Sequence, residues 1–254
     1  MRDINKNESY FHEIIENFND HTFERKQLLT SNKIEVERIP SFKCSIFTGQ
    51  LKCLIAKYSL GIDFFELSND VRKLCEEMNS LWSDFWLYYY RNNYLSQYIN
   101  SAYDEMIWML SFAIVLKVDD ESFIKLTEII DRNNVVDILF EKIISFRDPN
   151  RIPFEKESYH PKIQFIPNDF KSLRTAVLLK DKKEMEKLLG NYVSKEWYKN
   201  HINTGWCTKT IKDGYLGYWC FEAAAFVAIL DLDDSSFRDC PYYPKDLVDY
   251  FRSK

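Results

Sequence analysis

The sequence predicts an all-α protein in which two helical halves pack as a helical bundle or a helical-repeat-like array. Its 254 residues are 46% hydrophobic, which is enough to build a sizeable core. It contains only 6 glycines and 7 prolines, whereas β-sandwiches and barrels need many turn residues. Along most of the chain, apolar residues recur at the three- and four-residue spacing of an amphipathic helix.

The first half contains several predicted helices. Gly61 is expected to end one helix, because glycine readily adopts the left-handed conformation found at helix C-termini. Asp63 is expected to begin the next helix. Residues 103–117 are mostly apolar around the whole helical circumference, which predicts a buried helix. The helices expected in this half cover residues 8–29, 45–59, about 63–78, 103–117, 120–131 and 134–146, with an aromatic-rich segment at 82–98.

A proline-rich segment divides the chain. Four of the seven prolines fall between residues 147 and 168, and proline disfavours helix both at its own position and just before it. We therefore predict an N-terminal helical domain at 1–147, a linker at 148–168 and a C-terminal helical domain at 169–254. The helices expected in the second domain cover residues 169–179, 182–190, 192–201 and 217–230, with a last helix after Pro244.

Two segments on either side of this linker resemble each other. FAIVLKVDDESF at 112–123 and FVAILDLDDSSF at 226–237 share six identities in twelve positions, at an offset of 114. Such an echo predicts an internal pseudo-repeat of the two halves, although any junction of a helix, an aspartate turn and a helix could converge on this pattern.

Composition narrows the classes of function. The net charge is −5, and no continuous basic stripe interleaved with aromatic residues appears, so direct nucleic-acid binding is not expected. No two of the six cysteines have the close spacing of a zinc site, and we expect no metal and no cofactor. The polar N-terminus and the absence of a membrane-length apolar run predict a soluble, cytoplasmic protein that does not bind membranes.

Glu222 is the most unusual residue of the second half. It lies beside three alanines in an apolar segment, so its carboxyl is expected to be shielded and either paired or raised in pKa. A structural hydrogen bond or ion pair, with a lysine of 171–212 as one candidate, is the main interpretation. A partner contact and catalysis are the alternatives.

The acids that follow Glu222 have three interpretations. Asp234 or Ser235 can cap a following helix, the carboxylates of 231–234 can contact a partner, or they can hold a metal. The capping interpretation is favoured, because the glycine and the later glutamate of a calcium loop are missing.

Three blocks in order resemble the C-terminal domain of the PoNi family. They are YLGYWCFEAAA at 215–225, DDSSF at 233–237 and PYYPKDL at 241–247, with Trp197, Tyr198 and His201 upstream. In the first half, residues 51–61 and 103–122 are similar to the N-terminal domain of that family. Cys220 stands where the pattern has a serine.

This resemblance implies an all-helical immunity protein without catalytic activity. It would bind and neutralise a cognate nuclease effector toxin delivered by a bacterial secretion system. The competing hypotheses are a metal-dependent hydrolase that uses Glu222 and the Asp231–Asp234 cluster, and a helical scaffold for another protein partner. The oligomeric state stays open.

Site residues follow from these patterns. Because an acidic surface suits a basic partner, we predict toxin contacts at two acidic turns. The predicted contacts are Asp119, Asp120, Glu121, Asp231, Asp233 and Asp234. Trp219, Glu222 and Tyr243 are predicted to be structural parts of the motif.

Overall fold

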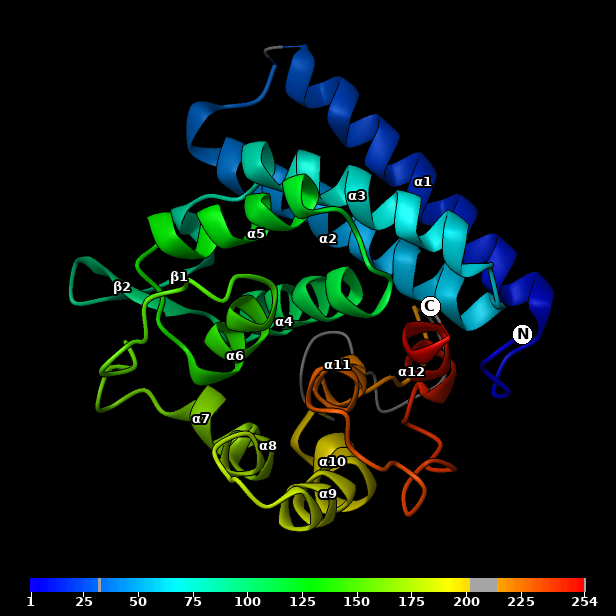
Figure 1. The fold of residues 1–254 in the computed structure, drawn as a ribbon. Helices are drawn as coiled ribbons and strands as arrows, with labels where there is room; N and C mark the ends of the chain where they lie inside the picture. Colours follow the sequence, from blue (N-terminus) through cyan, green and yellow to red (C-terminus); the bar gives the residue numbers. More distant parts are fainter. Residues whose placement is uncertain (32, 202–213, 254) are drawn as a thin grey trace.

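Helices form most of the protein and pack in three layers (Figure 1). The computed structural model describes residues 1–31, 33–201 and 214–253. The all-α prediction is confirmed, with the addition of one short β-hairpin. None of the helices in the described part of the chain is both long enough and apolar enough to span a membrane.

The upper layer in Figure 1 comes from the first half of the chain. Helix α1 lies along α2, α2 packs on α3, and α3 packs on α5. Gly61, with φ 99°, ends α2 as predicted, and the carboxylate of Asp63 accepts hydrogen bonds from the first turn of α3. The elements are α1 (Glu8–Thr30), the 3-10 turn η1 (Val36–Arg38), α2 (Ile39–Leu60), α3 (Phe64–Leu81) and α5 (Asp120–Arg132).

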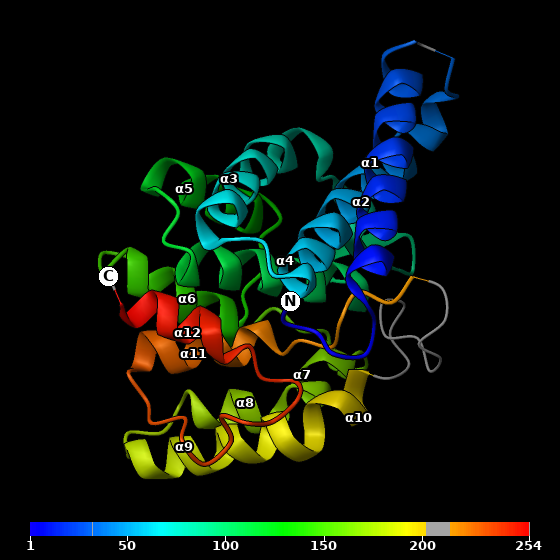
Figure 2. The same cartoon turned by 90° about the vertical axis from the view of Figure 1, so that its right-hand side faces the viewer.

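Helix α4 is the centre of the middle layer. Every residue from Ala102 to Val115 is buried, as predicted from its uniformly apolar sequence. This helix contacts α6, α11 and α12, so both halves of the chain share one core (Figure 2). The layer consists of α4 (Asn100–Val115), α6 (Ile138–Arg147), α11 (Phe221–Leu230) and α12 (Lys245–Arg252).

Short helices form the lower layer. They follow a segment, residues 148–164, that contains no helix. The elements are α7 (Phe165–Asp169), α8 (Lys171–Ala176), α9 (Lys182–Asn191), the π-helical turn η3 (Tyr192–Glu196) and α10 (Trp197–His201).

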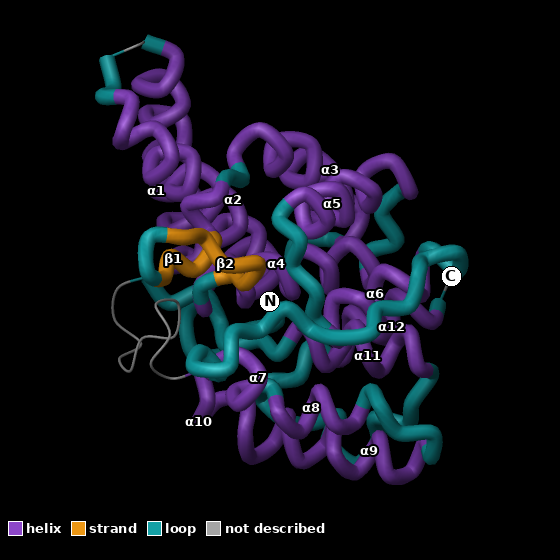
Figure 3. The backbone as a smooth tube through the Cα atoms, turned by 90° about the vertical axis from the view of Figure 1, so that its left-hand side faces the viewer, coloured by secondary structure: helices purple, strands orange, loops and turns teal. Residues whose placement is uncertain are grey.

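The aromatic segment at 82–98 contains a hairpin for which the sequence pattern assigned no element. A 3-10 turn η2 (Asp84–Trp86) leads into strands β1 (Leu87–Tyr90) and β2 (Asn93–Tyr98), which pair antiparallel (Figure 3). Arg91 and Asn92 both have positive φ, as a tight two-residue hairpin turn requires. This turn lacks the usual glycine, so the sequence did not signal it.

The two halves interlock instead of meeting at one flat boundary. The backbone N–H groups of Arg2 and Asp3 both donate to the carbonyl of Ser59. The guanidinium of Arg2 pairs with Asp246 near the C-terminus. The hydroxyl of Tyr215 donates to Asp3 at 2.6 Å. The N-terminal segment therefore fastens the second half to α2.

A buried ionic network at the start of α6 joins the middle layer to the lower layer. Asp137 begins α6, is fully buried and pairs with Arg174 of α8 at 2.5 Å. The hydroxyls of Tyr103 and Tyr159 also donate to its carboxylate, at 3.0 and 2.6 Å. Glu157 pairs with the same arginine. Residues of α4, α6, α8 and the helix-free segment therefore meet at one carboxylate.

The sequence echo corresponds to a shared helix ending. Lys117 after α4 and Asp231 after α11 both adopt the left-handed conformation, with φ 50° and 51°. At both places the next residue donates back to a helical carbonyl at 3.1 Å, from Val118 to Ala113 and from Leu232 to Val227. Beyond this point the structures differ, because α5 starts at Asp120 whereas residues 235–239 form turns. A repeat of the complete halves stays a prediction.

Candidate functional site

The first acidic turn lies at the start of α5. Asp119 caps the helix by accepting the N–H of Ser122 at 2.9 Å, and this hydrogen bond lowers the pKa of its carboxyl. Asp119, Asp120 and Glu121 are all exposed. Each is already near a basic side chain of the same protein. The pairs are Asp119 with Arg72 at 3.0 Å, Asp120 with Arg147, and Glu121 with Lys125 at 3.6 Å.

The second acidic turn follows α11. Asp231 pairs with Lys182 at 3.4 Å. Asp233 accepts hydrogen bonds from the N–H and the hydroxyl of Ser235, at 2.9 and 3.0 Å, and these bonds lower the pKa of its carboxyl. No helix begins here, so the prediction that Asp234 or Ser235 caps one is wrong.

Asp234 differs from the other predicted contact residues because only 4% of it is exposed. Its carboxylate accepts from Arg238 at 2.9 Å, Arg252 at 3.4 Å and the hydroxyl of Tyr243 at 3.0 Å. These contacts fasten the turn to α12. A residue held in this way is not accessible to a partner, so its assignment as a toxin contact is corrected to a structural role.

The C-terminal end of α12 lies between the two turns. Lys117, just before the first turn, lies over the ring of Phe251 at 5.0 Å. The neighbouring Arg252 donates to the carbonyl of Leu232 at 2.5 Å, within the second turn. The fold therefore brings the two turns to the same end of one helix, although most of their exposed carboxylates are paired internally.

Glu222 lies in the first turn of α11 and is fully buried. Its carboxyl accepts hydrogen bonds from the hydroxyl of Tyr192 at 2.9 Å and from the thiol of Cys220 at 3.3 Å. Burial raises the pKa of Glu222, which favours the neutral form. The described hydrogen-bond partners of Glu222 are a phenol and a thiol, where the sequence suggested a lysine. Lys209, Lys212 and Cys207 lie outside the described residues.

Trp219 and Gly217 connect the motif to α2. The indole N–H of Trp219 donates to the hydroxyl of Ser59 at 2.7 Å, and its ring meets Tyr58 edge-on. Gly217 has φ 99°, and a Cβ atom there would lie 2.3 Å from the Ser59 oxygen. Residues 215–220 are not helical, so α11 begins at Phe221, whereas the sequence predicted a helix from residue 217.

Glu222 and Asp231 lie at opposite ends of α11. At 1.5 Å per residue, nine steps separate them by about 14 Å along the helix. Within the described residues, no group of three or more His, Cys, Asp or Glu side chains could hold a metal. The structure therefore does not bring together the residues that the hydrolase hypothesis requires.

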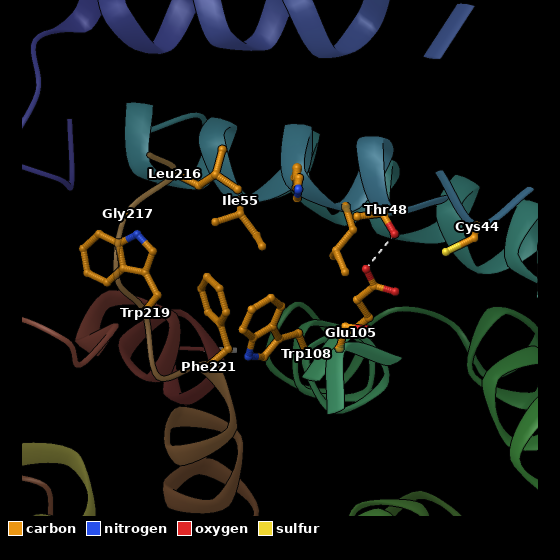
Figure 4. Close-up of a pocket in the computed structure, with 12 residues that line it drawn as sticks. Cys44, Thr48, Ile55, Glu105, Trp108, Leu216, Gly217, Trp219 and Phe221 are labelled. Atoms are coloured by element: carbon orange, nitrogen blue, oxygen red, sulfur yellow. Dashed lines mark hydrogen bonds between the residues drawn. The ribbon is translucent and has the colours of Figure 1, made fainter. Parts of the chain in front are cut away.

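One cavity lies between α2, α4 and the segment before α11, and its volume is about 200 Å³ (Figure 4). Its walls include Ile55, Trp108 and Phe221. Glu105, which is 7% exposed, faces this space and accepts from Thr48 at 2.7 Å and Trp86 at 3.1 Å. Burial raises its pKa to about 7. The sequence prediction missed this carboxyl, although its place inside the apolar run at 103–117 was a signal.

The cavity is smaller than the ~300–1,000 Å³ of typical small-molecule sites. Glu105 already accepts hydrogen bonds at both oxygens from the protein itself. This arrangement can hold a shielded, titrating carboxyl in place, and it explains how Glu105 is tolerated in the core.

The protein is mostly helical and consists of two interlocked halves. Asp234 and Glu222 are buried and serve packing, whereas the other acids predicted as site residues lie on the surface. Residues 2–128 match the family model for the N-terminal part of PoNe immunity proteins (PoNi), and residues 135–247 match the model for the C-terminal part. The chain belongs to the PoNi family of PoNe immunity proteins, as its motifs indicated.

A solved structure has the same fold. The crystal structure of protein PA2201 from Pseudomonas aeruginosa aligns with a TM-score of 0.71 and 15% sequence identity, covering 99% of this chain and 90% of that one. At this identity the likeness shows the fold alone. No curated protein sequence matches the chain.

Proposed function

We propose that this protein binds a cognate PoNe nuclease toxin in the bacterial cytoplasm and blocks DNA cleavage without catalysis of its own. The observation that carries the proposal is the match to both PoNi family models, in order, over nearly the whole chain. The internal roles of Glu222 and Asp234 agree with it, because these carboxylates serve packing. Binding to nucleic acid or membranes is not part of the proposal.

The exposed acids of the two turns remain proposed toxin contacts. A DNA-cleaving toxin needs a basic surface to hold the phosphate backbone, and acidic side chains attract such a surface. Because Asp120 and Asp231 are paired internally, we expect these turns to contribute mainly to the rate of association. The retained residues are Asp119, Asp120, Glu121, Asp231 and Asp233.

Neutralisation is tested with the nuclease encoded beside this gene. Plasmid cleavage by the purified toxin is followed while the protein is titrated in, with an unrelated acidic helical protein as control. We expect a complex with one copy of each chain and loss of cleavage at equimolar protein. Undiminished cleavage in excess protein, together with no complex on gel filtration, contradicts the proposal.

The turn contacts are tested separately by charge reversal. Asp120→Lys with Asp233→Lys should slow association at low salt, and the difference should shrink at high salt as the charges are screened. Asp84→Lys with Glu155→Lys introduces the same charge change at exposed positions outside both turns. Equal association rates for the two double variants remove the turns from the interface.

A further inference from the structure

Helix α1 is the outermost element of the upper layer and extends beyond the rest of the protein (Figure 2). Of its 23 residues, only Phe11 is fully buried. Its inward side packs on α2 through partly buried apolar residues such as Ile14 and Phe18. The opposite side of this long helix has no partner in the described structure.

The outward side of α1 is acidic. From Glu8 to Glu24 the helix contains five acidic residues and no lysine or arginine. Glu13, Glu16 and Asp20 lie three and four residues apart, so their side chains share one face. All three are exposed, and no ion pair involves any of them within the described residues.

This lack of pairing distinguishes α1 from the two acidic turns. At the turns, a lysine or arginine already neutralises most exposed carboxylates. On α1, Glu16 and Asp20 are four residues apart and repel each other, which costs helix stability. A basic surface placed against this face would relieve the repulsion without breaking an internal ion pair.

An apolar side chain continues the same face. Phe23 is 62% exposed. Phe23 follows Asp20 by three positions, so its ring extends the acidic stripe toward the end of the helix. A large apolar side chain beside charged residues has the character of an interface anchor, because its burial supplies affinity while the charges steer association.

We propose that the outward face of α1, formed by Glu13, Glu16, Asp20 and Phe23, docks the basic DNA-binding surface of the cognate toxin. This inference rests on the proposed function, since it names the surface through which neutralisation occurs. From Glu13 to Phe23 the face is about 15 Å long at 1.5 Å per residue.

The charges are tested with a matched pair of triple variants. Glu13→Gln, Glu16→Gln and Asp20→Asn together remove three unpaired carboxylates from α1. Glu128→Gln, Glu155→Gln and Glu184→Gln remove three exposed carboxylates elsewhere for which no ion pair is found among the described residues. We expect the α1 variant to associate with the toxin about tenfold more slowly at low salt and to lose most of the salt dependence, while the control stays within about twofold.

The apolar anchor is tested with Phe23→Ser. We expect Kd to rise about tenfold or more, chiefly through faster dissociation. Because these side chains are exposed, thermal unfolding should stay close to that of the unchanged protein, which excludes misfolding as the cause. Light scattering of the free protein tests whether a second copy of the chain binds this face instead of the toxin. A dimer that Phe23→Ser abolishes would overturn the proposal in favour of self-association.

The outcomes separate this inference from the proposed function. If the unchanged protein neutralises the toxin and both α1 variants bind like the control, the α1 surface is wrong and the immunity function stands. If the unchanged protein does not bind the toxin at all, the proposed function fails and this inference fails with it.

Discussion

The phenol of Tyr192 donates a hydrogen bond of 2.9 Å to the carboxyl of Glu222, and both side chains are fully buried. This contact joins the π-helical turn η3 to the first turn of α11. It gives Glu222 a structural role that explains why an acid can lie beside three alanines in the core.

Removing the donor should destabilise the fold. Tyr192→Phe leaves a buried oxygen with one hydrogen bond fewer, and we expect the free energy of unfolding to fall by about 1–3 kcal/mol. Glu222→Gln keeps an acceptor for the phenol and should cost less. Urea unfolding measures both. Complete loss of toxin neutralisation by a well-folded Glu222→Gln variant would contradict the structural role.

The buried pair of Asp137 and Arg174 should contribute strongly to stability. Arg174→Met leaves the carboxylate of Asp137 buried without its cation, and we expect a loss of about 3–5 kcal/mol in urea unfolding. Arg147→Met removes a cation whose partner, Asp120, is exposed, and should cost less than about 1 kcal/mol. Equal losses for the two variants would show that the network is not shielded from water.

Gly217 is predicted to tolerate no larger residue. The Cβ of alanine would lie 2.2 Å from the indole nitrogen of Trp219 and 2.3 Å from the Ser59 oxygen, at a positive φ. We expect Gly217→Ala to cost about 2–4 kcal/mol through steric overlap and backbone strain. Gly214→Ala shares the positive φ but meets no atom within 4 Å, so it should cost about 1 kcal/mol. Similar melting temperatures for the two variants would refute the close contact.

Glu105 should make stability depend on pH. Burial raises its pKa from 4.5 to about 7, so the folded state favours the neutral carboxyl. The stability that the neutral carboxyl contributes is fully present below pH 4.5. It declines as the pH rises from 4.5 through 7, by up to about 1.4 kcal/mol per pH unit. We expect urea unfolding of Glu105→Gln to lack this decline.

The pH effect of Glu105 is measured as the difference between the two proteins. His201 changes stability in the opposite direction. Burial lowers its pKa from 6.5 to about 4, so stability falls as the pH drops from 6.5 to 4. Subtracting the Glu105→Gln curve from the curve of the unchanged protein cancels this second contribution. A difference that stays constant between pH 4.5 and 7 would place Glu105 in a more polar environment.

Several helices were predictable because local sequence decides them. Gly61 ends α2 and Asp63 begins α3 through their own backbone and side chain, without distant contacts. The apolar circumference of α4 requires burial wherever the helix packs. The hairpin at 87–98 was not predictable in the same way, since Arg91 and Asn92 form its turn without glycine.

The sequence by itself determined the helical class, the buried central helix and, through three motif blocks in order, the immunity family. Only the tertiary structure decided which acids are available to a partner. Asp234 looks as available to a partner as Glu16 in the sequence, but the fold buries Asp234 and leaves Glu16 exposed. Pairing of several carboxylates depends on basic residues far away in the chain, such as Arg72 for Asp119, and local sequence carries no record of these distances.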